Sequence, residues 1–190
     1  MRIGFAAIAP LLMLLSGCWE SKTPLMPLAA RDLLPIDGRY NVLPVGGGEY
    51  VLVNLLGDRR YSVTGVSKDR PQQQPSFVSF DEIEQLPAVA PALARTSRIF
   101  IAQSEEQEGS NKHIYFGLII VDRNDDRFLT LRNLPPVCSD AVRLIVGAAA
   151  QADCVFDNYA QVQAAAIDAV RWMNDARVRL NSVAYVRPEI

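Results

Sequence analysis

The segment from His113 to Leu131, with the sequence HIYFGLIIVDRNDDRFLTL, carries the clearest β-hairpin pattern in the chain. Two runs rich in β-branched, aromatic and aliphatic residues, 113–121 and 127–131, flank the polar residues 122–126. The Asp and Asn side chains of that polar segment can hydrogen-bond to their own backbone, which favours a turn. We therefore predict two antiparallel strands joined by a short, solvated turn.

The first of these runs does not alternate cleanly between apolar and polar residues. Ile119, Ile120 and Val121 are consecutive, whereas a strand with one solvated face alternates with a period of two. Two interpretations remain open at this point. The strand is buried on both faces, or its outer face contacts a partner.

Outward from this hairpin, similar runs predict further strands, and the Gly-Asp-Arg sequence at 57–59 marks the turn of a second hairpin. The polar residues 104–112 include Glu105, Glu106 and Glu108. We interpret them as a solvated connection rather than a site for a basic partner. The additional predicted strands cover residues 39–43, 50–56, 60–66, 98–103 and 183–186.

Helical periodicity is concentrated late in the chain. Residues 159–177 place Val162, Ala166 and Val170 on one face with a period of 3.6, and a shorter helix is predicted to begin near Ser139. Strands therefore come first and helices late, with short connections between them. This order predicts an α+β fold class, with an antiparallel β-sheet built from hairpins and a C-terminal α-helix packed on one face.

The beginning of the chain has the pattern of an export signal. Arg2 is followed by the apolar run 3–15 and then by two small residues before Cys18. An apolar run of this length is too short to span a bilayer core, which needs about 20 residues. The sequence Leu-Ser-Gly-Cys that ends at Cys18 resembles the lipobox of bacterial lipoproteins. That resemblance implies a signal peptide over residues 1–17, cleavage before Cys18, and acyl chains such as palmitate on the new N-terminal cysteine.

The same resemblance implies a location in the cell. In Gram-negative lipoproteins, an Asp after the acylated cysteine favours retention in the inner membrane, whereas here the next residue is Trp19. We therefore expect a protein on the periplasmic face of the outer membrane, with the membrane as its partner through the lipid anchor. The rest of the chain resembles small uncharacterised proteobacterial lipoproteins in layout only.

Residues 18–35 are predicted to form the lipidated N terminus and an irregular tether, because Pro24, Pro27 and Pro35 interrupt regular structure. Residues 36–190 then form a single periplasmic α+β domain, which is long enough to bury a core without a metal. The alternative for the tether is a segment packed along the domain through its apolar side chains: Leu25, Met26, Leu33 and Leu34.

The cysteine count predicts one disulfide. With Cys18 acylated, Cys138 and Cys154 remain, and an even pair in an exported chain is typical of a disulfide. Such a bridge would close a short loop and stabilise the fold by about 3 kcal/mol in the chain-entropy description. The alternative is two reduced, buried thiols.

Candidate catalytic and metal-binding residues are few. His113 is the only histidine, and no Gly-x-Ser-x-Gly sequence accompanies it, so we interpret it as structural. Asp122, Asn124 and Asp126 match the first half of a calcium loop, but Arg127 stands where that loop needs glycine. We expect no enzyme activity, no metal and no cofactor.

Composition and charge favour a binding role without nucleic acid. The chain has 19 basic and 21 acidic residues in mixed order, and loss of residues 1–17 would change the net charge from −2 to −3. A nucleic-acid partner requires clustered basic residues. The leading hypothesis is a lipid-anchored, non-enzymatic binding or scaffold domain with an envelope protein as partner. The alternative is a periplasmic small-ligand or lipid carrier whose apolar pocket is lined by aromatic residues: Tyr61, Tyr115, Phe116, Phe128 and Trp172.

Overall fold

The computed structural model describes residues 19–43, 49–67, 74–108, 110–134, 136–148, 153–175 and 183–188. In chain order, the elements are β1 (Trp19–Ser21), η1 (Leu28–Ala30), β2 (Gly38–Leu43), β3 (Tyr50–Leu55), β4 (Tyr61–Val66), β5 (Ser76–Glu82), α2 (Leu86–Val89), α3 (Pro91–Thr96), β6 (Ser97–Glu108), β7 (Asn111–Asp122), β8 (Thr130–Leu134), α4 (Asp140–Val146), β9 (Cys154–Val155), α5 (Tyr159–Asp175) and β10 (Val183–Val186).

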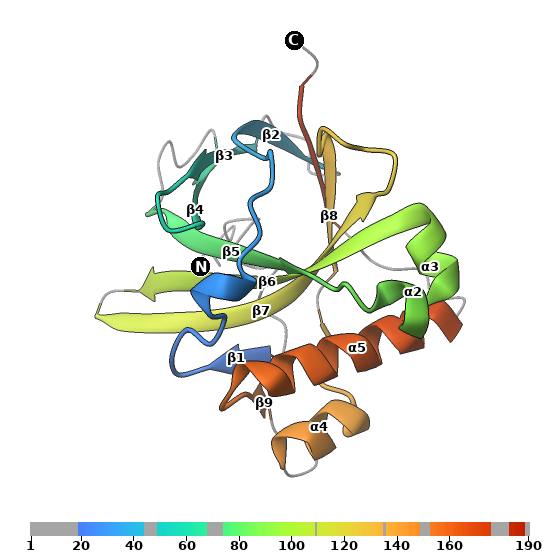
Figure 1. Ribbon diagram of the computed structural model, residues 1–190. Helices are drawn as coiled ribbons and strands as arrows, with labels where there is room; N and C mark the ends of the chain where they lie inside the picture. Colours follow the sequence, from blue (N-terminus) through green and yellow to red (C-terminus); the bar gives the residue numbers. More distant parts are fainter. Residues whose placement is uncertain are drawn as a thin grey trace, which may run out of the picture.

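Eight of the strands close into an antiparallel barrel (Figure 1). Their order is β6-β5-β4-β3-β2-β10-β8-β7, and the pairing of β6 with β7 completes the ring. Strand β10 pairs with β2 on one side and with β8 on the other. The predicted α+β class, an open sheet with the C-terminal helix packed on one face, is therefore wrong. An open sheet would leave β2 and β8 as unpaired edge strands. Here β10 pairs with both of them and closes the sheet.

Strand β7 explains the poor alternation of the segment that contains it. Ile119 and Val121 belong to the core inside the barrel, whereas Leu118 and Ile120 belong to a second core outside it. The strand is thus buried on both faces, which confirms one of the two interpretations. The predicted polar turn after β7 is present but longer than predicted, because β8 begins at Thr130 rather than at residue 127. The carboxylate of Asp125 accepts hydrogen bonds from two following backbone N–H groups, each at 2.9 Å.

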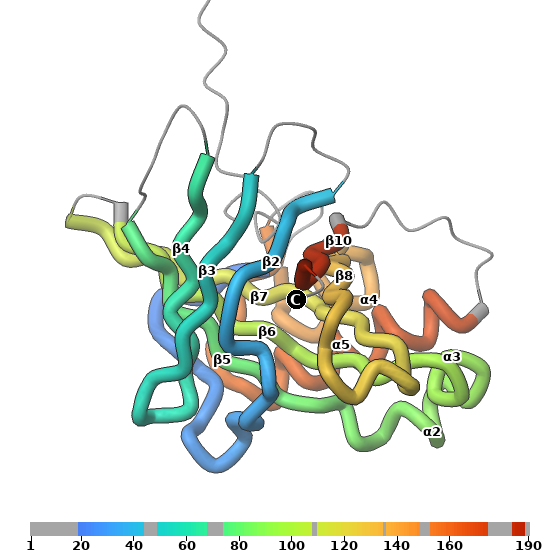
Figure 2. Tube along the Cα trace, turned by 90° about the horizontal axis from the view of Figure 1, so that it is seen from above, coloured from blue at the N-terminus to red at the C-terminus, as the bar shows by residue number. Residues whose placement is uncertain are grey.

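The second core lies on the outer surface of β6 and β7, where the helices gather (Figures 1 and 2). Helix α5 extends across this side, and α2, α3 and α4 contact it. Each helix contributes buried apolar residues to this outer core, for example Leu86, Ala94, Val142 and Val162. Strands β2, β3 and β4 lie on the opposite side of the barrel (Figure 1).

The barrel interior is filled by aromatic and β-branched side chains, whose polar ends reach the backbone. The Tyr40 hydroxyl donates to the Phe128 carbonyl oxygen over 3.0 Å, and the Tyr61 hydroxyl donates to the Leu34 carbonyl oxygen over 2.8 Å. Burial raises the pKa of both tyrosines. An eight-stranded barrel is just wide enough to be filled in this way or to hold one small ligand.

Candidate functional site

The N-terminal segment forms the most extensively built site on the outside of the barrel. Trp19 is fully buried, and β1 pairs antiparallel with β7 and parallel with β9. Met26 and Leu34 are also buried. This part of the chain therefore packs apolar side chains into the two cores, as the alternative of a packed segment expects, although Leu33 is 56% exposed. Cys18 and the predicted signal peptide lie outside the described residues.

Trp19 occupies a pocket made by the disulfide region. Its indole Nε1 donates to the Val137 carbonyl oxygen over 3.2 Å, and its ring meets Phe156 edge-on with centroids 5.5 Å apart. Trp19 is the direct register partner of Cys154. The disulfide between Cys138 and Cys154 is present, with Cα atoms 5.7 Å apart, which confirms the prediction. The bridge therefore holds the segment that receives the indole.

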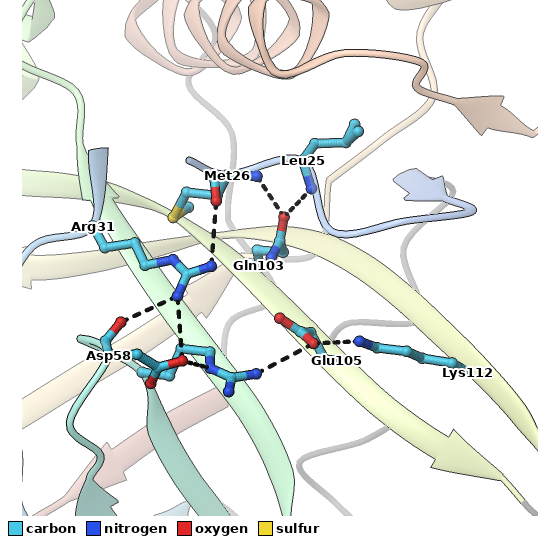
Figure 3. Close-up of polar contacts among 8 residues, drawn as sticks. Leu25, Met26, Arg31, Asp58, Gln103, Glu105 and Lys112 are labelled. Carbon is cyan, nitrogen blue, oxygen red and sulfur yellow. Dashed lines mark hydrogen bonds and ion pairs between the residues drawn. The ribbon is translucent and has the colours of Figure 1, made fainter. Parts of the chain in front are cut away.

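Gln103 fixes the next part of the segment (Figure 3). This side chain is fully buried, and its Oε1 accepts hydrogen bonds from the backbone N–H groups of Leu25, at 2.7 Å, and Met26, at 2.8 Å. A side-chain amide thus replaces the backbone acceptor that a paired strand would supply. Further along, the Asp32 N–H donates to the Phe80 carbonyl oxygen over 2.7 Å.

Charged side chains form a network close to Gln103 (Figure 3). The Glu105 carboxylate is only 4% exposed and lies 2.7 Å from Lys112 Nζ and 3.5 Å from Arg60 Nη1. Arg60 also pairs with Asp58, whose carbonyl oxygen accepts from Arg31 Nη1 over 3.1 Å. A buried carboxylate requires such opposite charges, because its desolvation is costly. The network joins the N-terminal segment to the β3–β4 turn and to the β6–β7 hairpin.

Sequence reasoning missed the central residues of this site. Residues 104–112 were predicted to be a solvated connection, but they form the outer part of the β6–β7 hairpin, with Glu105 paired opposite Ile114. Gln103 and Glu105 are both buried, two positions apart on β6, and Gln103 bonds to the N-terminal segment. No alternation of apolar and polar residues marks this stretch, because residues 103–108 are all polar.

The barrel interior contains a small apolar cavity of about 60 Å³. Val51, Val63 and Ile119 line it together with Tyr185. The hydroxyl of Tyr185 is buried and has no hydrogen-bond partner within the described part of the chain, and burial raises its pKa. Sites for drug-sized ligands have volumes of about 300–1,000 Å³, so the cavity holds at most a very small molecule.

A hollow between β5 and α5 is more polar, with a volume of about 150 Å³. Asp81 lines it and accepts a hydrogen bond from the Tyr159 hydroxyl over 2.6 Å. Desolvation raises the pKa of Asp81, an effect that the hydrogen bond from Tyr159 opposes. Burial likewise raises the pKa of Tyr159, so this hydroxyl stays a donor. Within the described ranges, no group of three or more His, Cys, Asp or Glu residues could hold a metal ion.

The residues singled out in sequence are dispersed over the fold. His113 lies on β7 and stacks on Tyr115, with ring centroids 6.0 Å apart. The turn with the partial calcium pattern is occupied by its own bonds, since Asp122 accepts from the Asn124 N–H over 2.9 Å. The proposed aromatic lining does not form one pocket. Tyr61 and Phe128 are in the barrel core, Phe116 is in the outer core, and Trp172 is half exposed on α5.

Comparisons with known proteins add no identity to this geometry. Among the helices that the structure describes, none is both long and apolar enough to cross a membrane. No protein-family description, curated protein or solved structure matches the chain.

Proposed function

We propose that this protein is a lipid-anchored cell-envelope protein whose barrel acts as a non-enzymatic binding or scaffold domain at the membrane surface. Cys18 carries the acyl chains after residues 1–17 are removed, and the identity of Trp19 favours the periplasmic face of the outer membrane. A compact β-barrel is compatible with a binding or carrier domain. The partner is another envelope component, and nucleic acid and cofactors have no part in the function.

The burial of Trp19 is the observation that supports this proposal most strongly. Consecutive Cα atoms are about 3.8 Å apart, so the folded domain begins one residue after the acylated cysteine. Trp19 is also fixed there by its indole hydrogen bond and by pairing with β7 and β9. A domain held this way has a defined position at the membrane, which suits a scaffold better than a carrier that must reach a distant acceptor.

The carrier alternative has weaker support. A lipid or metabolite carrier needs an internal site of suitable volume, and the cavity in the barrel is about 60 Å³. The interior is otherwise occupied by bulky side chains such as Tyr40, Tyr61 and Phe100. Native mass spectrometry of the protein extracted from cells tests this point directly. A bound metabolite or lipid inside the barrel would favour the carrier.

The anchor is tested by the mass of the mature N terminus. We expect a chain that begins at Cys18 and carries two or three acyl chains, because one chain gives only marginal membrane binding. Cys18→Ala should abolish acylation and processing, whereas Thr23→Ala, a change at an exposed nearby position, should leave both intact. A mature chain without acyl groups would contradict the proposal.

The scaffold role is tested by crosslinking in intact cells. We compare the native protein with a variant that has a flexible Gly-Ser linker inserted between Cys18 and Trp19. Both proteins carry the anchor, but only the native one holds its barrel at a fixed distance from the membrane. We expect one envelope protein to be captured by the native form and severalfold less by the linker variant. Equal capture, or no specific capture by either form, would contradict the scaffold role.

A further inference from the structure

The outside of the molecule carries a marked apolar feature close to Trp19. Leu144 is 84% exposed and Val137 is 64% exposed, and these are the two most exposed large hydrophobic side chains in the described parts of the chain. They are not scattered over the surface. Both lie within residues 136–148, the segment that includes α4.

This segment is attached directly to the beginning of the domain. The Val137 carbonyl oxygen accepts the Trp19 indole hydrogen bond, and Cys138 is bridged to Cys154, the register partner of Trp19. Helix α4 contacts β9, which in turn pairs with β1 (Figure 1). Val137 and α4 therefore lie beside the point where the described chain enters the fold.

The orientation of α4 presents Leu144 away from the protein. Val142 is fully buried in the outer core together with Trp19, and residues two positions apart on a helix point to nearly opposite sides. Ser139 caps the helix by accepting from the Val142 N–H over 3.2 Å, and Gly147 ends it in a left-handed conformation with φ of 67°. A short helix fixed at both ends thus holds one leucine outward.

The two charged side chains of α4 balance each other. Asp140 and Arg143 pair at 3.0 Å, so they cancel on the helix. A surface leucine in this setting has the character of an interfacial membrane contact, where an apolar group enters the boundary between headgroups and acyl chains. Exposed apolar side chains close to Trp19 would gain burial by entering the lipid interface.

We propose that Val137 and the outer side of α4 form the membrane-facing surface of the protein, with Leu144 inserted at the lipid interface. This inference rests on the proposed lipid anchor at Cys18 and adds the orientation of the barrel. Acyl chains on one residue hold a protein to a bilayer but leave its rotation free. A second contact through Leu144 selects one orientation and turns β2, β3 and β4 toward the space where a partner is found.

Site-specific tryptophan fluorescence tests the surface. The acylated mature protein, which begins at Cys18, is reconstituted in phosphatidylethanolamine and phosphatidylglycerol vesicles whose acyl chains are brominated close to the headgroups. All variants carry Trp172→Phe to reduce background. Leu144→Trp places the reporter on α4, and Leu55→Trp is the matched control, since Leu55 is 44% exposed at the end of β3, a strand on the side of the barrel opposite α4 and α5 (Figure 1).

We expect about twofold weaker emission from the Leu144→Trp reporter in brominated than in plain vesicles, because an interfacial side chain lies near the bromine atoms. The Leu55→Trp reporter should change little. Equal quenching of both reporters, or no quenching of Leu144→Trp while the protein sediments with the vesicles, would overturn the proposed surface and leave the anchor intact. Protein that carries no acyl chains would overturn the proposed function, and the proposed surface with it.

Discussion

The barrel interior differs chemically from the docking site, the outer surface of the barrel that holds the N-terminal residues 19–35. Inside the barrel, aromatic and β-branched residues fill the space, and buried hydroxyl groups such as that of Tyr61 bond to backbone. On the outer surface, residues 25 and 26 are held by hydrogen bonds to Gln103, and Arg31 joins an ion-pair network that reaches Glu105 through Asp58 and Arg60. Packing therefore depends on side-chain volume in the barrel interior and on the positions of individual polar atoms at the docking site.

The difference teaches where specificity of placement comes from. An apolar core tolerates exchanges that preserve volume. It therefore stabilises the barrel but does little to determine which segment packs against it. Hydrogen bonds to a buried amide oxygen or carboxylate depend on direction and distance, so a displaced segment loses them. The residues that position the N-terminal segment are accordingly polar, although they are as buried as the core.

The largest expected effect comes from the interior. Phe100→Ala removes a fully buried ring whose centroid lies 6.0 Å from that of Phe128. We expect a loss of about 3–5 kcal/mol in the free energy of unfolding, measured by urea denaturation. Leu129→Ala, at an exposed position, is the control and should change stability little. A small effect at Phe100 would show that the interior is not the main source of stability.

A smaller and more local effect is expected at the docking site. Glu105→Gln removes the charge that Lys112 and Arg60 neutralise, and we expect a loss of about 2 kcal/mol. Hydrogen exchange should locate the loosening in residues 25–31, with the barrel strands unchanged. Glu84→Gln, at an exposed carboxylate, serves as the matched control. Loosening of the whole barrel would remove the distinction between the two regions.

A substitution in the barrel cavity is expected to raise stability rather than lower it. Tyr185→Phe deletes a buried hydroxyl for which no partner exists among the described residues, and the ring stays in place. Because an unpaired buried polar group is costly, we expect a gain of about 1 kcal/mol in stability, seen as a higher midpoint of urea unfolding. Tyr61→Phe, which loses two hydrogen bonds with Leu34, should be destabilising. A destabilised Tyr185→Phe would indicate that the hydroxyl has a bound partner.

The smallest expected effect is a dependence on pH at Asp81. Burial raises the pKa of this carboxyl above its ordinary value of 3.8, so the folded state holds a proton more tightly than the unfolded state. The resulting contribution to stability is fully present below pH 3.8 and is lost as pH rises through the folded pKa. Asp81→Asn removes the titration, and its stability relative to the native protein should increase across this range. Thermal unfolding of both proteins at several pH values measures this difference in stability. A difference that does not change with pH would contradict the raised pKa of Asp81.

Local features of the fold could be predicted from the sequence. The hairpin around β7, the polar turn that follows it, helix α5 and the Cys138–Cys154 bridge depend on short patterns or on residue counts. Closure of the barrel could not, because β10 has the same local pattern whether one edge or two edges are paired. The pattern does not show that Tyr185 pairs with Val42 on one side and with Leu131 on the other.

The docking site was hidden for a related reason. Three prolines suggested an irregular tether, yet proline restricts only the local backbone and does not prevent contact with a distant surface. The partners of the segment lie far along the chain, with Gln103 on β6 and Val137 before α4. A residue such as Glu105, which looks solvated in a polar run, becomes buried only when its ion-pair partners are placed around it.

The position of β10 also has a consequence for how the chain acquires its structure. Strands β2 and β8 become neighbours only through β10, and Tyr185 pairs with Val42 near the other end of the chain. A ring whose closing segment emerges last cannot close during synthesis, and such non-local contacts form slowly. The barrel therefore remains an open sheet until residues 183–186 have been added to the chain.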